Sequence, residues 1–212
     1  MTTLDTGAAP RRLSASTLRR LLFVAMGAMT LWALYVYDWP LLKPGSADMA
    51  RLKTYGWWIP LHAVFGVTAF LIGPFQFSAT LRARNIRLHR RLGQTYVACV
   101  TIAATMAFVI GLWFESFGIT QVLAQAVAWL ICTHAAWLAA RNRNVMQHKL
   151  WIARSYGLTF IFVTSRAVLG TFFVGASNWA INDADWALMT AALVIPDLIM
   201  AGNAIRPWKR AG

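Results

Sequence analysis

Long apolar runs separated by short charged connectors constrain this chain more than any other feature. Hydrophobic residues make up 58% of the 212 residues, charged residues only 13%, and the mean hydropathy is +0.53. A soluble domain of this size does not carry such a composition, whereas about 20 apolar residues can span a bilayer as a helix. The apolar runs lie at about 21–37, 57–81, 92–114, 121–140, 147–175 and 186–205. The sequence therefore predicts an all-α, polytopic membrane protein with a bundle of six transmembrane helices.

The distribution of charge predicts how this bundle is oriented. A net charge of +13 often indicates a nucleic-acid partner, but here the positive residues stand in clusters between the apolar runs. Most Lys and Arg residues lie in the N-terminal segment, in 82–91, in 141–149 and at the C-terminus, and the other connectors are nearly neutral or acidic. Basic connectors remain on the cytoplasmic side of a membrane. We therefore expect a lipid bilayer rather than nucleic acid as the partner, and a multi-pass protein of the bacterial inner membrane.

Both termini are then cytoplasmic, and the chain divides into three parts. Residues 1–20 form a cytoplasmic tail, residues 21–205 the six-helix transmembrane domain, and residues 206–212 a second cytoplasmic tail.

A polar stripe on the fifth run indicates that the bundle has a polar interior. At about 100° per residue, four polar side chains fall within roughly 40° of one direction on a helix: His148, Ser155, Thr159 and Arg166. Lipid cannot solvate such a stripe, so the stripe must face protein or a water-filled cavity.

Further polar residues on other runs extend this predicted interior. His62 and Gln76 lie on the small-residue face of the second run, and Asp197 lies near the middle of the sixth. A single charge in hydrocarbon is costly, so we expect Arg166 and Asp197 to form a buried pair that acts as a structural clamp. The predicted polar core therefore comprises His62, Gln76, Ser155, Thr159, Arg166 and Asp197.

His89 and His148 form the strongest candidate site, because they stand at matching depth at the cytoplasmic ends of the third and fifth runs. Two neutral imidazoles that face each other at one depth can ligate the iron of a b-type haem from both sides. The nearby Arg90, Arg91 and Arg154 would pair with the haem propionates. An alternative stays open, since histidines at helix ends commonly cap helices or contact lipid headgroups.

A second histidine pair, His62 with His134, is a weaker candidate. Their predicted depths differ by about 10 Å at about 1.5 Å per residue, and His134 lies off the small-residue face of its run. Packing or a polar contact is the expected role of His134.

Four motifs in the second to sixth runs are shared with a known family: residues 62–66 with 73–77, 88–96, 148–166 and 195–198. In these motifs the chain resembles a family of uncharacterised bacterial membrane proteins, described only as predicted membrane proteins of unknown function. The resemblance implies the membrane-spanning fold and supplies no activity, and the family usually has Asn where Asp197 stands here. A looser likeness, in architecture only, is to six-helix dihaem b cytochromes, which carry one histidine on each of four consecutive spans.

Two functions from different classes follow. The first is a haem-binding protein for membrane electron transfer, with a quinone or a redox protein as its partner. The second is a non-enzymatic transporter of a small molecule or anion, or a membrane accessory protein with a structural polar core. The sequence contains no phosphate-binding loop, nucleophile elbow or cysteine-based metal motif, so it assigns no catalytic activity.

Overall fold

The structure of the chain, a computed structural model, describes residues 15–39, 43, 45, 49, 56–113, 118–165, 175 and 177–205. Within these ranges the chain is helical and contains no strand, so the all-α prediction is confirmed. The helices are α1 (Ala15–Ala33) with its π-helical continuation η1 (Leu34–Asp38), α3 (Trp58–Gln76), α4 (Ala79–Arg84), α5 (Ile86–Trp113), α6 (Ile119–Arg141), α7 (Val145–Thr164) and α9 (Asn178–Ile205).

The long helices coincide with the predicted apolar runs. Among the described residues, α3, α5, α6 and the Asn178–Gly202 part of α9 are each long and apolar enough to cross a membrane. The apolar part of α1 is shorter and covers Val24–Val36. Helix α7 occupies the first part of the predicted fifth run. Several apolar helices are thus present, as in a multi-pass membrane protein. That the spans number six, and how they are oriented, stay predictions.

Three helix boundaries differ from those predicted, because polar residues cap or extend helices that hydropathy alone cannot delimit. The second run is divided, since α3 ends at Gln76 and the Ser78 hydroxyl accepts a hydrogen bond from the Leu81 amide to begin α4. Helix α5 begins within the basic connector, where the Asn85 side chain caps the Leu88 amide at 2.9 Å. Helix α9 begins at Asn178 rather than near 186, and Ser177 caps the Ala180 amide.

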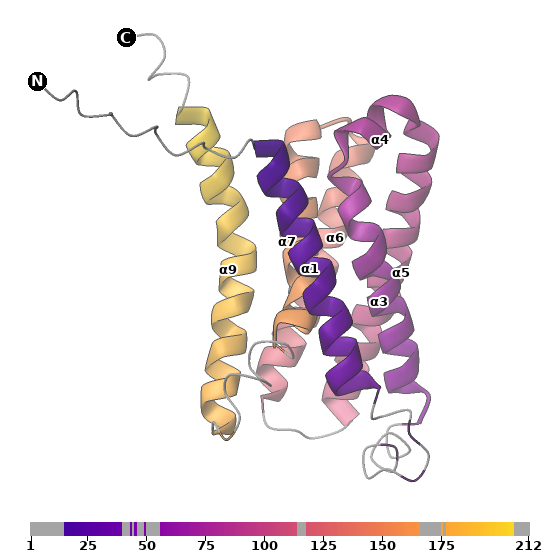
Figure 1. Cartoon of the computed structure of the whole chain (residues 1–212), viewed down its shortest axis with the longest axis vertical. Coiled ribbons are helices and arrows are strands. Elements are labelled where there is room, and N and C mark those ends of the chain that lie inside the picture. The colour runs from indigo at the N-terminus through magenta and orange to yellow at the C-terminus, as the bar shows by residue number, and fades with distance from the viewer. Residues whose placement is uncertain are drawn as a thin grey trace, which may run out of the picture.

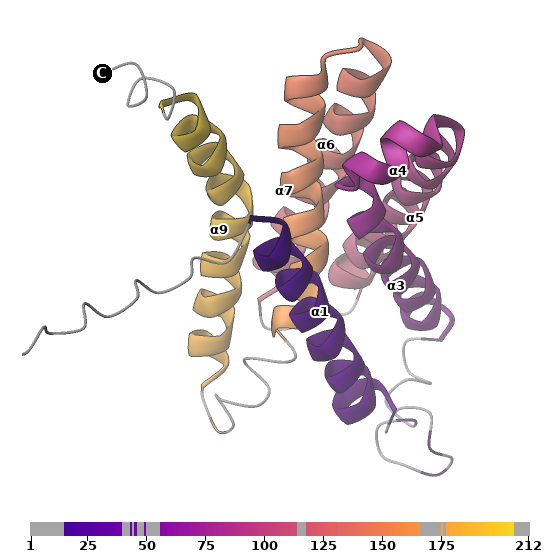
Figure 2. The same ribbon diagram turned by 45° about the horizontal axis from the view of Figure 1, so that its top comes forward.

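The helices pack as neighbouring pairs along the bundle. Figures 1 and 2 show α3 beside α5, and α6 beside α7, with α9 at the edge against α7 and α1 across the outside. Small residues permit two close approaches. The ring of Tyr156 on α7 lies over Gly73 on α3, and a Cβ added to Gly157 on α7 would lie 3.1 Å from the Cβ of Ala192 on α9.

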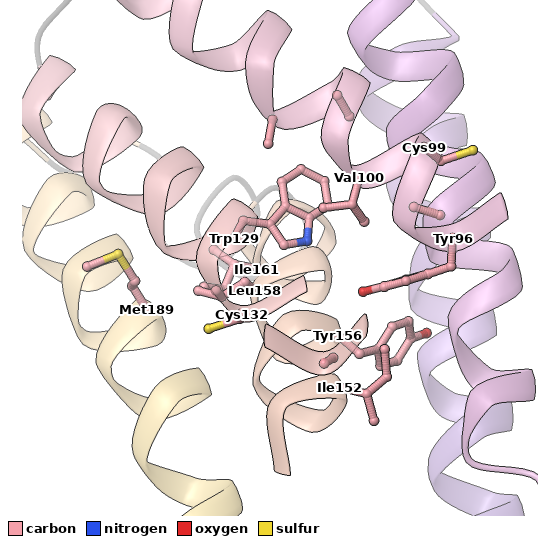
Figure 3. Close-up of a cluster of buried hydrophobic side chains, with 14 residues drawn as sticks. Tyr96, Cys99, Val100, Trp129, Cys132, Ile152, Tyr156, Leu158, Ile161 and Met189 are labelled. Atoms are coloured by element: carbon pink, nitrogen blue, oxygen red, sulfur yellow. The ribbon is translucent and has the colours of Figure 1, made fainter. Parts of the chain in front are cut away.

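The buried core lies where α5, α6 and α7 meet. Figure 3 shows Tyr96 reaching into the cluster from α5 and Trp129 from α6, with Met189 of α9 at its edge. Val100, Leu158 and Tyr96 are almost completely buried. This core divides the bundle into the end that carries α4 and the α6–α7 turn and the opposite end, which carries the α9 N-terminus.

Candidate functional site

A cavity of about 530 Å³ lies at the end of the bundle that carries α4 and the α6–α7 turn. We call it the basic cavity, because α4, α5, α6 and the turn after α6 contribute four arginines to its wall and no carboxylate is among its described lining residues. Its polar lining residues are Gln76, Arg82, His89, Arg90, Gln94, Arg141, Arg143 and His148. The four arginines are exposed, so the cavity reaches the surface of the bundle.

His89 and His148 both line this cavity, as their predicted common depth implies. The Nδ1 atom of His148 lies 2.9 Å from the carbonyl oxygen of Ala136, which fixes the ring and leaves Nε2 as its other polar atom. His89 is 7% exposed and interacts with the backbone of Phe75 and, electrostatically, with His148. Histidines of two different helices are thus held at the wall of one cavity.

Two buried polar atoms in this wall have no hydrogen-bond partner in the described part of the chain. They are Nδ1 of His89 and Nε2 of Gln76, whose residues are 7% and 5% exposed. A buried polar group without a partner costs about 1–3 kcal/mol, and native structures contain few of them. Both atoms therefore have unused hydrogen-bonding capacity in residues that line the basic cavity.

Arg143 occupies an unusual backbone conformation at the mouth of the cavity. Its φ is +57°, the left-handed region that a helix C-terminus usually reserves for glycine. Its amide donates to the Ala140 carbonyl at 3.2 Å, and the Asn144 amide donates to the Ala139 carbonyl at 2.9 Å, which closes the end of α6. An arginine here costs about 1 kcal/mol relative to glycine, and in return it adds a guanidinium group to the cavity lining.

Two arginines predicted to lie near the histidine pair do not line the basic cavity. Arg91 is exposed on α5, whereas Arg90 is part of the lining. Arg154 is about 120° from His148 around α7 and therefore lies on the face that packs against α9. The grouping of Arg154 with His89 and His148 is thus not found, because helix geometry places Arg154 on another side.

Arg154 pairs instead with Asp197 of α9. Its Nη2 atom lies 2.6 Å from Asp197 Oδ2, its Nε donates to the Leu193 carbonyl at 3.1 Å, and its guanidinium lies 4.4 Å from the centre of the Trp151 ring. The predicted partner of Asp197 was Arg166, which lies outside the described residues. An ion pair between the fifth and sixth runs is present, but another arginine of the fifth run forms it, and the Asp197 side chain is 44% exposed in the bundle rather than buried as predicted.

The described residues of the polar stripe of α7 face protein or the basic cavity, whereas Arg166 lies outside the described residues. Ser155 and Thr159 are 0% and 3% exposed and both hydrogen-bond to the hydroxyl of Tyr96, at 2.9 and 3.0 Å. Thr133 joins Ser155 at 2.7 Å, and the indole nitrogen of Trp129 donates to Thr159 at 3.0 Å. Tyr96 and Trp129, which belong to this hydroxyl network, lie in the core shown in Figure 3, and none of the hydroxyl-bearing residues lines the basic cavity.

His62 and His134 do not share a site with each other. His62 lines a second cavity at the opposite end of the bundle, and its Nδ1 lies 2.8 Å from the Ala103 carbonyl. His134 lines neither cavity, and its Nδ1 contacts the Leu130 carbonyl of its own helix at 2.9 Å. The described residues contain no group of three or more His, Cys, Asp and Glu side chains that could hold a metal ion.

Several residues of functional interest were not identified from the sequence. Arg82, Arg141 and Arg143 were counted as connector charges. Arg82 and Arg90 lie eight residues apart on two different helices, and this spacing alone does not show that both side chains line one cavity. Asp185 was placed in an acidic connector, yet it lies within α9 and lines the second cavity. The signal for Asp185 was its spacing of four residues from the buried Met189.

Comparisons with known proteins agree with the membrane architecture and assign no activity. No curated protein and no solved structure matches the chain. One family, described as "Predicted membrane protein (DUF2306)", matches residues 59–202, which is most of the chain. The matched range includes His62, His89, His148 and Asp197. The chain therefore belongs to the DUF2306 family of predicted membrane proteins.

Proposed function

We propose that the basic cavity binds a b-type haem between His89 and His148, and that the protein carries electrons within the membrane. The main support is that histidines of two different helices line one cavity of about 530 Å³ that is surrounded by four arginines. This volume lies in the range of about 300–1,000 Å³ that is usual for cofactor and drug-sized ligand sites.

The two imidazoles suit an iron ligand set. Metal-ligating histidines usually donate their second ring N–H to a carbonyl or carboxylate, and the contact of His148 Nδ1 with the Ala136 carbonyl provides such a partner. His89 supplies a buried Nδ1 that lacks a partner among the described residues. Each residue therefore has a ring nitrogen that a bound iron would satisfy.

The arginines suit the acidic side of the same ligand. Arg82 and Arg90 approach from α4 and α5, and Arg141 and Arg143 approach from the end of α6. Guanidinium groups pair with carboxylates through charge-assisted hydrogen bonds, so these residues would hold the two propionates. A bound haem would supply reversible one-electron chemistry, while the chain supplies ligation, charge and shielding from water.

The charge pattern supports a location of this cavity on the cytoplasmic side of a bacterial inner membrane. Its partner in electron transfer would then be a quinone in the bilayer or a cytoplasmic redox protein.

A second candidate is the binding or transport of a small anion without a metal. The observation in its favour is Gln76, whose Oε1 lies 3.0 Å from the position of a Cβ added to Gly93. The amide of Gln76 thus covers the glycine that would otherwise leave room for a porphyrin face. Its unpartnered Nε2 and the four arginines suit an oxyanion such as phosphate or a carboxylate.

Absorbance spectroscopy tests the haem proposal. The wild type and the variants His89→Ala, His148→Ala and His134→Ala are expressed with haem supplementation and purified in detergent. We expect a Soret band and a split α-band in the wild type, and the loss of low-spin haem in either cavity variant, because six-coordinate iron needs both imidazoles. His134→Ala is the matched control and should retain the spectrum, since His134 does not line the cavity.

Colourless wild-type protein that is folded and has haem available would falsify the haem proposal. Isothermal titration with inorganic phosphate and with succinate then tests the second candidate. Binding that is lost in the double variant Arg141→Gln/Arg143→Gln supports an anion site, and no binding of either anion contradicts it.

A further inference from the structure

The second cavity lies at the opposite end of the bundle and has a different chemistry. Its volume is about 280 Å³, and α1 with η1, α3, α5, α6, α7 and α9 contribute to its wall. We call it the aromatic cavity, because Phe70, Trp129 and Phe162 line it with mainly aliphatic neighbours. No Lys or Arg is among its described lining residues.

Most polar side chains of the aromatic cavity already have partners within the protein. The Thr30 hydroxyl donates to the Met26 carbonyl at 2.7 Å, and the Trp129 indole donates to Thr159. The Gln125 amide donates to the Leu158 carbonyl at 3.4 Å and accepts from Gln121 at 2.8 Å. These groups fix the wall of the cavity and do not require a ligand.

Asp185 is the exception. Its carboxyl group accepts a hydrogen bond from the Ser165 side chain, but its Oδ1 atom is buried and has no partner within the described ranges. A carboxylate in apolar surroundings is strongly unfavourable unless a cation or several hydrogen bonds compensate it. The aromatic cavity therefore contains an acceptor for which the described residues supply no cation.

We propose that the aromatic cavity is a binding site for a small organic cation, a protonated amine with an apolar body. The ammonium group pairs with the Asp185 carboxylate, and the apolar body packs against Phe162 and against the edge of Phe70, whose ring is stacked on Tyr156 and Phe160. Aromatic faces attract cations through their quadrupole, and this attraction increases when water is excluded. The carboxylate and the rings thus favour the same class of ligand.

The lining selects an organic cation over a metal ion. Calcium and magnesium require about six oxygen ligands, and the described lining offers one carboxylate whose neighbours are mainly apolar. The volume of about 280 Å³ lies just below the range of about 300–1,000 Å³ for drug-sized ligands, so the amine is small. A monocyclic arylalkylamine has the required charge, size and apolar surface.

Isothermal titration of the full-length protein in detergent tests this site with benzylamine and, as a neutral ligand of nearly the same shape, benzyl alcohol. We expect benzylamine to bind roughly tenfold or more tightly than benzyl alcohol, because a hydrogen bond to a charged group contributes about 1.5–3 kcal/mol. Asp185→Asn should remove this preference. Asp183→Asn is the matched control, since Asp183 is an exposed acid two positions before Asp185 on α9.

Three results would overturn the proposal. Equal affinity for the amine and the alcohol in the wild type shows that the carboxyl group holds a proton and attracts no cation. An equal loss in Asp183→Asn shows a general surface charge effect. Benzylamine binding that is absent in the wild type and appears only in the Arg166→Gln variant shows that Arg166 itself compensates the Asp185 carboxylate.

A second variant keeps the test decisive if Asp185→Asn does not fold. Phe162→Leu retains apolar volume and removes a ring from the wall of the cavity. We expect several-fold weaker binding of both benzylamine and benzyl alcohol, because the benzyl group of each packs against this ring, while the preference for the amine remains. An unchanged benzylamine affinity in a folded Phe162→Leu protein contradicts the proposed site.

Discussion

The basic and aromatic cavities lie at opposite ends of one bundle, and their charged side chains differ both in sign and in exposure to solvent. Four arginines surround the basic cavity, and all four are exposed, so water and salt screen them. The aromatic cavity has one described carboxylate, and one of its oxygens is buried. A single desolvated charge can therefore influence a ligand as strongly as several charges at a rim.

The two cavities are separated by the hydroxyl network of Tyr96, Thr133, Ser155 and Thr159. Thr159 also lines the aromatic cavity, whereas the network residues are not part of the lining of the basic cavity. The network is fully buried and internally hydrogen-bonded, so it forms a rigid layer between the ends. Changes at one cavity should then leave ligand binding at the other unchanged.

The largest predicted effect concerns orientation and is all-or-none. A topology reporter fused after Gly212, or inserted within 141–149, should report cytoplasm, because basic connectors remain inside. A reporter inserted within 115–120 is the control and should report periplasm. A periplasmic signal from the 141–149 insertion would place the basic cavity on the periplasmic side and the aromatic cavity on the cytoplasmic side, which is the reverse of the predicted orientation.

Asp197→Ala tests a charge pair that belongs to neither cavity. The change leaves Arg154 without its carboxylate, and we expect a loss of about 3 kcal/mol in the free energy of unfolding. Arg154→Met/Asp197→Ala should be less destabilised than the single variant, because it removes the stranded cation. Thermal unfolding in detergent gives both values, and additive losses would show that the two residues do not interact. Ligand affinities of both cavities should stay unchanged in the folded fraction.

Tyr96→Phe tests the layer between the cavities. The hydroxyl of Tyr96 is hydrogen-bonded to Ser155 and Thr159, so its removal should cost about 1–2 kcal/mol of stability. Tyr156→Phe is the matched control, because the Tyr156 hydroxyl makes one long bond, 3.3 Å to the Phe70 carbonyl. Equal melting temperatures of the two variants would contradict a structural role for the network.

Arg143→Gly should produce the smallest change and the most informative one. Glycine relieves the positive φ, so we expect about 1 kcal/mol of added stability, measured as a higher melting temperature in detergent. The same variant loses a guanidinium from the basic cavity, so haem or anion binding there should weaken while benzylamine binding does not change. Arg84→Gly, on the exposed end of α4, is a control that removes a guanidinium outside the cavity lining. Weaker stability in Arg143→Gly would contradict this account of the turn.

The helices and their inward faces could be predicted from the sequence, because apolar length and angular spacing are local properties. The burial of Ser155 and Thr159 follows from their position on the α7 stripe, and the common cavity of His89 and His148 follows from their depth. Both features require only a helix and a bilayer.

The identity of contacting partners could not be predicted in this way. Asp197 pairs with Arg154 because Gly157 brings that face of α7 close to Ala192 of α9, and the sequence does not show which faces meet. Asp185 was assigned to a connector because acidic residues are typical of connectors. Its position inside α9 depends on the cap at Ser177, which extends the helix beyond the apolar run.

The Arg154–Asp197 pair also has a consequence for biosynthesis. Helix α7 is synthesised before α9, so Arg154 is without its carboxylate until the last helix has entered the membrane. A charge at the centre of a spanning helix costs about 2.5–3.5 kcal/mol on insertion scales, and in the predicted six-span arrangement each helix of the pair carries one. Helix α9 lies at the edge of the bundle beside α7, where it can dock late (Figure 1). In the predicted six-span arrangement, a nascent chain that stops before α9 would retain an uncompensated cation in the bilayer, which is a signal that membrane quality control can recognise.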